Sequence, residues 1–350
     1  MDVYASAFPT PRPDVAVVGA GAMARALGLR LTEAGYPVRA VVSRTAARAE
    51  GLADLLGAAV ASDLLDDLPA VPLVVLAVPD DQIAETAEML VGADRSWAGA
   101  VVLHTSGAAT ASVLEPLRAE GARTLAFHPV QSLASGADAR RLDGVTVGLE
   151  GEPAGVAAGI ELAVGLGLRY LVVSAEAKAR YHLAATMASN LLVTLVGMVQ
   201  EVLASIDIDR AQAVTLLGPL VEGTLETLSQ TSPEEALTGP VLRGDLGTLR
   251  AHGLALRKDL PHLVPAYAAL SVETVRLAVR AGRLAPDRAE GVLALMERMV
   301  TLPLPGGPAP PPVPPRAPRT ERPREAGDDA DDEHPGWVAE PAHRWDPVTS

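Results

Sequence analysis

Three observations predict an α/β fold, in which a doubly wound parallel sheet is followed by an all-helical domain. An apolar run, Val15 to Val18, leads into a glycine-rich turn and then into an Ala- and Leu-rich helical pattern. Short apolar runs alternate with helical stretches as far as residue 173, which is typical of parallel sheets. Helical periodicity then dominates from Ser174 to Leu302.

These patterns divide the chain into four parts. We expect a flexible N-terminus at 1–13, a sheet domain at 14–173, a helical domain at 174–302 and a disordered, Pro-rich acidic tail at 303–350. The last assignment follows from composition, because a segment rich in Pro, Arg and acidic residues cannot bury enough surface to offset its ordering entropy.

The composition excludes several classes of protein. The formal net charge is −14 and no basic stretch stands out, which argues against general binding of nucleic acid or of an anionic membrane. Cys is absent, so disulfides, zinc–thiolate sites and a cysteine nucleophile are excluded. Aromatic residues make up only 3% of the chain, so the core must be built from Ala, Val and Leu.

The N-terminus lacks the basic region and apolar run of a signal peptide, and we expect a cytoplasmic protein. The uncharged segment from Leu183 to Gln200 is long enough to raise the question of a membrane span. Because it contains Thr186, Ser189 and Asn190, a helix buried in a helical domain or in a dimer core is the better interpretation. We therefore expect no contact with a membrane.

The glycine-rich turn follows a strand and opens a helix, which is the context of a dinucleotide-binding motif. In that motif Gly19 permits the tight turn, Gly21 leaves room for a pyrophosphate beside the backbone, and Ala24 lets the helix pack close to the sheet. The free N–H groups at the start of the helix, at Ala22 and Met23, would bind the anion. The alternative is a tight turn in another kind of α/β protein.

The second strand, Val38 to Val42, ends in Ser43 and Arg44, where NAD-preferring domains carry an Asp or Glu that bonds the ribose 2′-hydroxyl. A hydroxyl and a guanidinium suit a 2′-phosphate instead. We therefore expect a Rossmann domain at 14–173 with NADP as its cofactor, unless Arg44 is simply a solvated surface charge. Val78 and Pro79, at the end of the fourth strand, complete the expected cofactor site.

Further strands are expected at 58–60, 73–78, 99–103, 124–127, 145–149 and 170–173. The fifth and sixth strands run into turns that carry histidines, His104 to Gly107 and His128 to Ser132. Ligands of doubly wound sheets sit beyond the carboxyl ends of the strands, where both turns fall. In the helical part, breaks are expected at 218–219, 232–233 and 238–240.

The helix that opens the helical part carries polar residues on one face. Lys178, His182 and Ser189 recur at helical spacing, with Thr186 and Asn190 on the flank. Unpaired buried polar groups cost about 1–3 kcal/mol each, so this stripe must meet a partner, a ligand or water. An active-site wall is one answer. The other is an exposed Lys178, with His182 and Asn190 bonded inside a helix interface.

Taken together, the following segments resemble one family: Gly19–Ala24, His104–Gly107, Phe127–Ser132, Lys178–Asn190 and Leu237–Asp245. They resemble the two-domain Rossmann-like proteins whose helical half is known as domain of unknown function 2520, over about residues 14–302. These proteins are similar to ketopantoate reductases, β-hydroxyacid dehydrogenases and pyrroline-5-carboxylate reductases, with a helical half of the 6-phosphogluconate dehydrogenase-like type. The resemblance implies an oxidoreductase whose helical domains bind substrate and pair as a homodimer.

The related dehydrogenases use a helix-borne Lys to protonate the substrate carbonyl and an Asn one turn later to position it. Lys178 matches this Lys by place, but its one-turn neighbour is His182, and the nearest Asn on the helix is Asn190. Hydride arriving at a ketone carbon creates an alkoxide, which needs a proton donor or cation, and Lys178 could supply both. The choice between Lys178 and His182 as the acid, and the role of Asn190, stay open.

Other polar residues could bind the substrate. His128 and Ser106 are candidates to hold a carboxylate or hydroxyl, against the alternative of hydrogen bonds that stabilise their turns, and His104 is a weaker candidate. Arg243 offers a guanidinium for a carboxylate, or pairs with Asp245 in its own loop. The histidines lack the spacing of a recognised metal site, so no metal is expected.

The sequence thus predicts an NADP-dependent reductase of a small 2-oxo acid, with ketopantoate, reduced to pantoate, as the leading substrate. Two alternatives remain open. One is an imine reductase for a cyclic substrate such as pyrroline-5-carboxylate, whose iminium form already carries its proton. The other is an NADP-binding sensor or scaffold without turnover.

Overall fold

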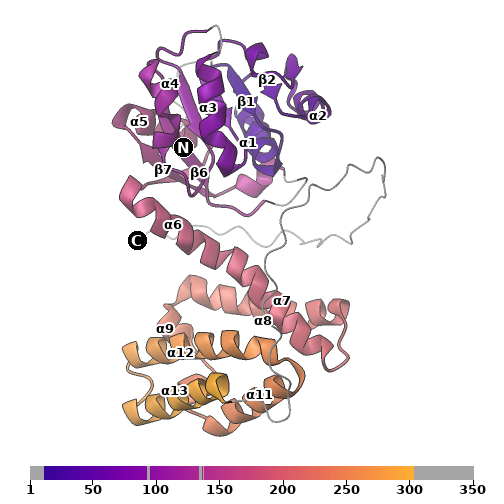
Figure 1. Ribbon diagram of the computed structural model, residues 1–350, viewed down its shortest axis with the longest axis vertical. Helices are drawn as coiled ribbons and strands as arrows, with labels where there is room; N and C mark the ends of the chain where they lie inside the picture. Colours follow the sequence, from indigo (N-terminus) through magenta and orange to yellow (C-terminus); the bar gives the residue numbers. More distant parts are fainter. Residues whose placement is uncertain (1–11, 93–94, 134–135, 137, 303–350) are drawn as a thin grey trace, which may run out of the picture. The chain divides into compact units, whose positions relative to one another are not determined.

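The computed structural model describes residues 12–92, 95–133, 136 and 138–302, so the tail expected at 303–350 and nearly all of the expected flexible N-terminus lie outside it. The chain divides into two compact units, one up to Ser232 and one from Pro233 (Figure 1). The boundary expected at Ser174 falls where the sheet ends and a helix begins, inside the first unit.

The first unit is built on an eight-stranded sheet with the order β3-β2-β1-β4-β5-β6-β7-β8. Its strands are Val15–Val18 (β1), Val38–Val42 (β2), Val60–Ser62 (β3), Leu73–Leu76 (β4), Val101–His104 (β5), Arg123–Pro129 (β6), Thr146–Gly151 (β7) and Arg169–Val172 (β8). Neighbouring strands from β3 across to β6 are parallel. The chain order reverses between β1 and β4, where such sheets bind ligands. The predicted doubly wound α/β fold is confirmed.

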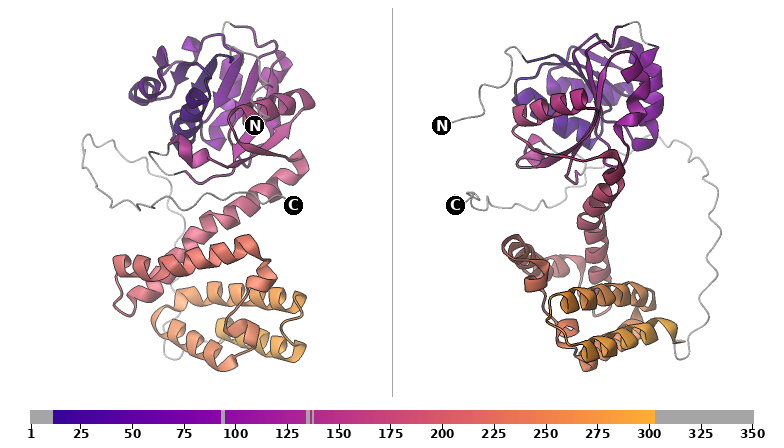
Figure 2. Two further views of the ribbon diagram at one scale, coloured as in Figure 1. Left: turned by 180° about the vertical axis from the view of Figure 1, so that it is seen from behind. Right: turned by 90° about the vertical axis from the view of Figure 1, so that its left-hand side faces the viewer.

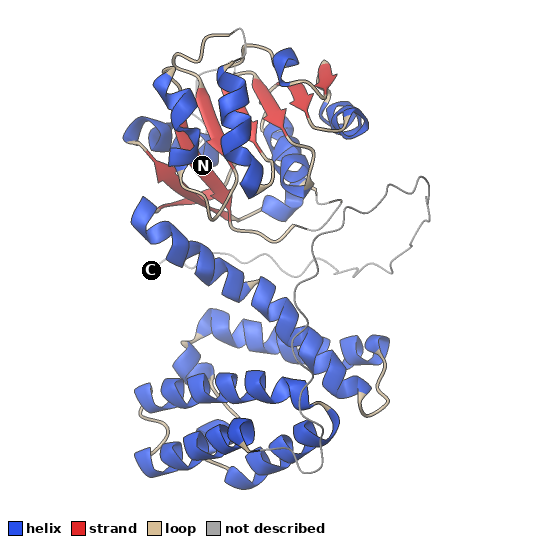
Figure 3. Ribbon diagram, in the orientation of Figure 1, coloured by secondary structure: helices blue, strands red, loops and turns tan. Residues whose placement is uncertain are grey.

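Helices cover both faces of this sheet, as the views in Figures 2 and 3 show. They are Ala22–Glu33 (α1), Ala46–Leu56 (α2), Ile83–Val91 (α3), Glu115–Ala119 (α4) and Pro153–Gly165 (α5), with 3₁₀ turns at Leu65–Asp67 (η1), Asp80–Gln82 (η2), Ala111–Leu114 (η3) and Ala139–Leu142 (η4). Because side chains alternate along a strand, Val15 and Val17 join the core beneath α1, α2 and α5, whereas Ala16 and Val18 join the core beneath α3 and α4.

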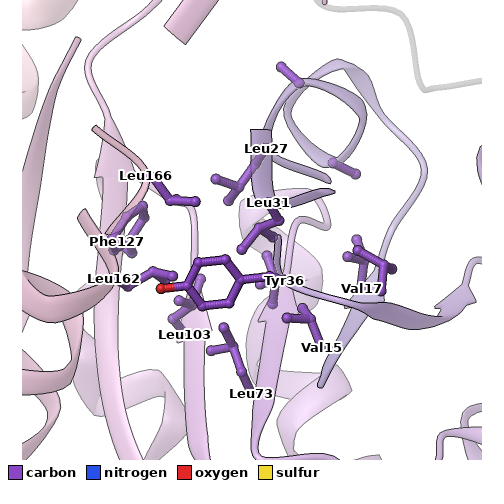
Figure 4. Packing of buried hydrophobic residues seen from close by; sticks show 14 of the residues in the cluster. Val15, Val17, Leu27, Leu31, Tyr36, Leu73, Leu103, Phe127, Leu162 and Leu166 are labelled. Atoms are coloured by element: carbon purple, nitrogen blue, oxygen red, sulfur yellow. The ribbon is translucent and has the colours of Figure 1, made fainter. Parts of the chain in front are cut away.

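The core on the α1 side is almost entirely aliphatic. Figure 4 shows the ring of Tyr36 surrounded by side chains that include Leu31, Leu73 and Leu103. Burying a Val or Leu side chain contributes about 1.5–3 kcal/mol, so many small contributions replace the few large aromatic ones of other proteins. This matches the core expected from the low aromatic content.

One strand departs from the predicted all-parallel sheet. β7 runs antiparallel to β6, with Gly148 opposite His128, and β8 is again parallel to β7. Among the described residues between β6 and β7, the one helical element is the short η4, which packs against α1. A parallel strand needs a crossover that spans the sheet, usually a helix, and without one the chain returns in the opposite direction.

After β8 the first unit continues as Ala175–Ala188 (α6), Asn190–Ala204 (α7) and Arg210–Gln230 (α8). α8 runs through Pro219, so the predicted break at 218–219 is wrong; a proline removes only one helical donor, and this helix also starts from a capping box of Asp209 and Gln212. The stretch 175–204 is long and apolar enough to cross a membrane by length and composition, and none of its most apolar window is buried in the structure.

The second unit contains Pro233–Ala236 (α9), Pro240–Arg243 (α10), Leu246–Asp259 (α11), Pro261–Leu263 (η5), Val264–Arg280 (α12) and Pro286–Thr301 (α13). Its core includes Leu249, Val275, Val292 and Met296. The predicted breaks at 232–233 and 238–240 are confirmed, because Pro233 and Pro240 each begin a helix, where a missing N–H costs nothing.

Candidate active site

Two glycines with different requirements shape the turn after β1. Gly19 has φ = 111°, and a Cβ there would lie 2.2 Å from the carbonyl oxygen of Ala77, so only glycine fits. Gly21 is extended, and a Cβ there would meet nothing within 4 Å. Its backbone therefore borders open space at the N-terminus of α1, where no side chain caps the free N–H groups. This is the geometry of an anion site.

A cleft of about 570 Å³ extends from this turn along the carboxyl ends of β1, β2 and β4. It is lined by most of the predicted cofactor residues: Gly19, Gly21, Ser43, Arg44, Val78 and Pro79. Ala22 borders an adjoining cavity of about 310 Å³. Met23 lines neither cavity. Ala24 is fully buried in the core, so it serves the packing of α1 and does not face the cleft.

Two arginines that the sequence reasoning missed border the same region. Arg48, on α2, lines both cavities, and Arg25, in α1, lines the smaller one. The Nε of Arg25 is buried and has no hydrogen-bond partner in the described chain. Arg44 and Arg48 are exposed, so their charges are accessible to a phosphate, although Asp63 and Asp66 line the larger cleft as well. Arg48 could have been found from the sequence, because it follows Arg44 by four positions.

His104 ends β5 and is fully buried. Its Nδ1 accepts a hydrogen bond from the backbone N–H of Ser106 at 3.2 Å, so Nε2 carries the proton and donates to the carbonyl oxygen of Thr110, also at 3.2 Å. Burial, with the Lys178 charge nearby, lowers the pKa of His104 to about 4. The ring is therefore neutral at pH 7 and fixes the loop that follows β5.

Ser106 is buried in the same loop. Its Oγ accepts hydrogen bonds from the backbone N–H groups of Ala108 and Ala109, at 3.1 and 2.9 Å. This is the turn-stabilising role that the sequence left as an alternative. Neither bond uses the hydroxyl proton, so a substrate contact from Ser106 stays a prediction.

His128, on β6, is held by Tyr181 of α6. The His128 Nδ1 lies 3.0 Å from the Tyr181 hydroxyl, and the rings meet edge to face. Burial raises the pKa of Tyr181 to about 12, and burial with the charges of His182 and Lys178 lowers the pKa of His128 to about 4. Because the Gly148 backbone also bonds the Tyr181 oxygen, we assign the hydroxyl as donor to a neutral ring whose Nε2 carries the proton.

Gly148 makes this contact possible. It lies opposite His128 on β7, and a Cβ there would be 2.2 Å from the Tyr181 oxygen. Any side chain at this position would displace the hydroxyl that orients His128. The sequence analysis assigned no role to Tyr181 or Gly148, because their contact joins residues that are 33 positions apart through an antiparallel strand that was not foreseen.

Lys178 is the buried residue of α6, with its side chain 3% exposed. Its Nζ lies 3.6 Å from Oε2 of Glu150 on β7, and the same oxygen accepts the backbone N–H of Ala111 at 2.7 Å. Burial lowers the pKa of Lys178, while Glu150 and Asp80 act against that shift. The alternative of an exposed Lys178 is wrong. Glu150 is a further residue that the sequence reasoning missed.

His182 follows Lys178 by one helical turn, and its Nδ1 is buried with no hydrogen-bond partner among the residues described. A Cβ at Gly107 would lie 2.4 Å from this Nδ1 and 2.8 Å from Nε2 of His128, so both rings pack against the loop after β5. The centroids of the two rings are 5.9 Å apart. The structure thus brings His128 of β6 together with Lys178 and His182 of α6, two segments that are far apart in the sequence.

The cluster of His104, His128, Lys178 and His182 lies on the same side of the sheet as the cleft, at the carboxyl ends of the parallel strands. Asp80 follows Pro79 of the cleft, and its charge acts on His104, His128 and Lys178. Ligands that fill the cleft would therefore end next to the cluster, as expected at the carboxyl ends of parallel strands.

Three other candidates have the following places in their own elements. Asn190 is exposed at the start of α7, after the helix is interrupted at Ser189. In the second unit Asp245 caps α11 by accepting the N–H of Thr248 at 3.0 Å, and Arg243 ends α10. Their roles toward a substrate stay predictions. Within the described residues no group of three or more His, Asp or Glu side chains could hold a metal.

Two family models match the chain, and they meet in the connection between β6 and β7. A Rossmann-like domain matches residues 3–129, and domain of unknown function 2520 matches residues 145–274. A search of the curated proteins found no match.

Solved structures share the fold at low identity. A protein from Bacteroides fragilis, provisionally named an NADP oxidoreductase, is 21% identical with a TM-score of 0.62, over 77% of this chain and 98% of that one. The protein TM1727 from Thermotoga maritima is 25% identical with a TM-score of 0.60, over 76% and 98%. A reductive aminase from Aspergillus terreus, solved with NADPH and ethyl levulinate, is 17% identical with a TM-score of 0.50, over 83% and 94%.

Both halves of the sequence-based assignment are thus confirmed. The chain carries a Rossmann-like domain followed by domain of unknown function 2520, and it shares its fold with a structure that is provisionally named an NADP oxidoreductase.

Proposed function

We propose that the protein is an NADPH-dependent reductase of a small 2-oxo acid, with ketopantoate as the first substrate to test. One observation carries this proposal: an open cleft beside Gly21 and a buried cluster around Lys178 lie on the same side of the sheet. The names of similar structures support it: one is an NADP oxidoreductase by provisional name, and another was solved with NADPH.

The cleft fits NADP at two places. The pyrophosphate would lie against Gly21, because that backbone borders open space and the N–H groups of α1 lack a side-chain cap. The 2′-phosphate would lie at Ser43 and Arg44, with Arg48 as a second cation at the same cleft. When bound, the cofactor supplies the hydride.

The reduced oxygen then needs a proton, and two groups of the cluster could deliver it. Lys178 has the carboxylate of Glu150 at 3.6 Å, which favours its charged form, so it could stabilise an alkoxide and donate a proton to it. His182 is the second candidate, since its Nδ1 lacks a partner in the described chain. The Nε2–H of His128 and the hydroxyl of Ser106 would bind the oxygens of the substrate.

Reduction of a cyclic imine is the second candidate function, and one observation favours it. The side chain of Lys178 is only 3% exposed and is paired with Glu150, so a substrate that depends on it must displace well-packed groups. An iminium already carries its proton and does not require Lys178 as an acid. For such a substrate the Lys178–Glu150 pair would serve the structure alone.

We also propose that the protein forms a homodimer through α6 to α8. These helices expose many large apolar side chains, among them Leu183, Met187, Leu191, Val193, Leu195, Leu216, Leu220 and Leu225. Apolar surface of this extent usually marks an interface. Light scattering should give twice the mass of one chain, and a monomer would count against the proposal.

The test is a panel of 2-oxo acids and cyclic imines, with the purified full chain and NADPH consumption followed by absorbance. Ketopantoate should be reduced, and Lys178→Met should lower kcat by about 100-fold or more, because general acid catalysis contributes that much. The Kd for NADPH should change little. Lys258→Met is the matched control, since that lysine is exposed and lies in the second unit.

The other outcomes separate the alternatives. If imines are reduced and Lys178→Met does not change their turnover, the protein is an imine reductase and the proposal of a keto-acid reductase is overturned. Tight binding of NADPH without consumption across the whole panel would overturn both and leave a sensor or scaffold.

A further inference from the structure

Glu150 is a buried carboxylate that enters the proposed reaction only through its contact with Lys178. The residue is 6% exposed, and its Oε2 serves two partners at once, the Nζ of Lys178 at 3.6 Å and the backbone N–H of Ala111 at 2.7 Å. Burying a carboxylate is costly unless it is paired and hydrogen-bonded, and here both conditions are met. Glu150 thus joins α6 to the start of η3, next to the loop after β5.

The use of lysine in this chain makes the pair unusual. Of the 29 basic residues only Lys178 and Lys258 are lysines, and all others are arginines. Lys258 has a side chain that is 81% exposed, whereas that of Lys178 is 3% exposed. Arginine pairs with carboxylates better and does not release its proton in proteins, whereas a buried lysine can. A lysine at this position points to a proton that moves.

Several charged and titratable groups surround Lys178. Glu150 comes from β7, Asp80 from η2, His104 from β5 and His128 from β6. Among the described residues, Glu150 is the carboxylate that forms an ion pair with Nζ, and Asp80 is exposed. Glu150 is therefore the group best placed to control the ammonium.

We propose that Glu150 is the positioning residue of Lys178: its carboxylate holds the ammonium within the cluster and ties it to the loop after β5 through Ala111. The inference rests on the proposed function in one respect, because it takes Lys178 as the proton donor. Glu150 itself touches neither substrate nor cofactor in this assignment. It acts by fixing where the proton of Lys178 is and when it is lost.

The first experiment needs no substrate. With ¹⁵N-lysine labelling, the Nζ spectrum of the full chain should contain two lysine signals, and Lys258 serves as the internal reference. Lys178 should lose its proton at a lower pH than is ordinary for a lysine, because burial lowers its pKa. In Glu150→Gln it should lose its proton at a still lower pH. Gln keeps an oxygen for the N–H of Ala111, so the variant removes the charge and preserves the loop contact.

The second experiment measures kinetics on the substrate found with the panel. Glu150→Gln should move the basic limb of the kcat profile to lower pH and reduce kcat at pH 8 by about tenfold or more. Glu150→Asp, which retains the charge, should restore part of the activity. In a Lys178→Met background Glu150→Gln should cost little more, because residues that act as one unit are not additive.

Glu152→Gln is the matched control, since Glu152 is exposed and pairs with Arg118. An unchanged Lys178 titration in Glu150→Gln would overturn the proposal, and so would additive losses in the double variant. If Glu150→Gln fails to fold, Glu150→Asp and the double variant decide the question. If no substrate is reduced, the proposed function fails, while the lysine titration still tests the link between Glu150 and Lys178.

Discussion

The two ends of the candidate site lie on one sheet edge but are built differently. The nucleotide end is made by backbone: the shape of the Gly19 turn and the uncapped start of α1. The cluster end is made by side chains that meet across long stretches of sequence, with 28 positions between Glu150 and Lys178 and 53 between His128 and Tyr181. Backbone geometry leaves a local pattern in the sequence, whereas a cluster assembled by tertiary contacts does not.

The difference extends to energetics. At the nucleotide end Gly21, Arg44 and Arg48 are exposed, so a substitution at these three positions should affect binding more than folding. Gly19 is the exception, because it is buried in the turn. At the cluster end the groups are buried, and the pKa values of His104 and His128 are lowered to about 4 by burial. Changes there should affect folding, pH dependence and turnover together.

The largest expected effect contrasts the two glycines of the turn. Gly19→Ala should destabilise the protein by about 3 kcal/mol or prevent folding, because Cβ would both clash with Ala77 and require a strained φ. Gly21→Ala should cost no more than about 1 kcal/mol, since its backbone is extended and its Cβ meets nothing. Urea unfolding measures both.

The same pair tests the nucleotide site. Gly21→Ala should fold and yet weaken NADPH binding by about tenfold or more, because its Cβ would occupy the space assigned to the pyrophosphate. Unchanged NADPH affinity in a folded Gly21→Ala protein would contradict the placement of the cofactor in this cleft.

The second effect is a loss of stability in acid that originates at the cluster end. The unfolded histidine has a pKa near 6.5, and the folded values for His104 and His128 are about 4. Between these values the unfolded chain binds more protons than the folded one, so stability falls as pH drops from about 6.5 to 4. The upper limit is about 3 kcal/mol for each ring.

Urea unfolding at pH 7 and at pH 4.5 measures this loss. His104→Gln should be less stable at pH 7, because the bonds to Ser106 and Thr110 are broken, but it should lose less further stability on acidification. An equal acid-induced loss in His104→Gln and the wild type would show that this ring does not contribute.

The third effect concerns the orientation of His128. Tyr181→Phe removes the hydroxyl without a clash, and Gly148→Ala should displace it, because the new Cβ would lie 2.2 Å from the Tyr181 oxygen. Both variants should lower kcat by about tenfold, with NADPH affinity retained, as expected when a ring loses the partner that orients it. A normal kcat in Tyr181→Phe would show that the hydroxyl is not needed to orient His128.

These contrasts explain which parts of the molecule were predictable from the sequence. The strands, the alternation with helices and the lining of the cleft by Gly19, Gly21, Ser43 and Arg44 follow from local patterns, and the structure contains them. The orientation of β7 was missed, because nothing in its own residues distinguishes the two directions. Orientation depends on whether the preceding connection carries a crossover helix.

The same limit applies to the cluster. Helical spacing placed Lys178 and His182 on one face of a helix, but the spacing of residues along a helix cannot show that Lys178 is buried. Its partner Glu150 lies on β7, the strand whose direction was missed. The position of Tyr181 depends on the absence of a side chain at Gly148. In the sequence Gly148 is an ordinary glycine of a strand, and only the pairing of β6 with β7 shows why it matters.

The smallest expected effect tests the nucleotide end through charge alone. Arg44→Ser and Arg48→Ser should each reduce the preference for NADPH over NADH by about tenfold, because each removes a cation from the proposed 2′-phosphate site without disturbing the backbone that holds the pyrophosphate. The effect should shrink as salt rises, since both arginines are exposed. Affinities for NADH, measured by fluorescence titration, should change little. If the wild type binds NADH and NADPH equally, the role of Arg44 is lost, and the sequence pattern after β2 indicates a cleft without indicating which cofactor it prefers.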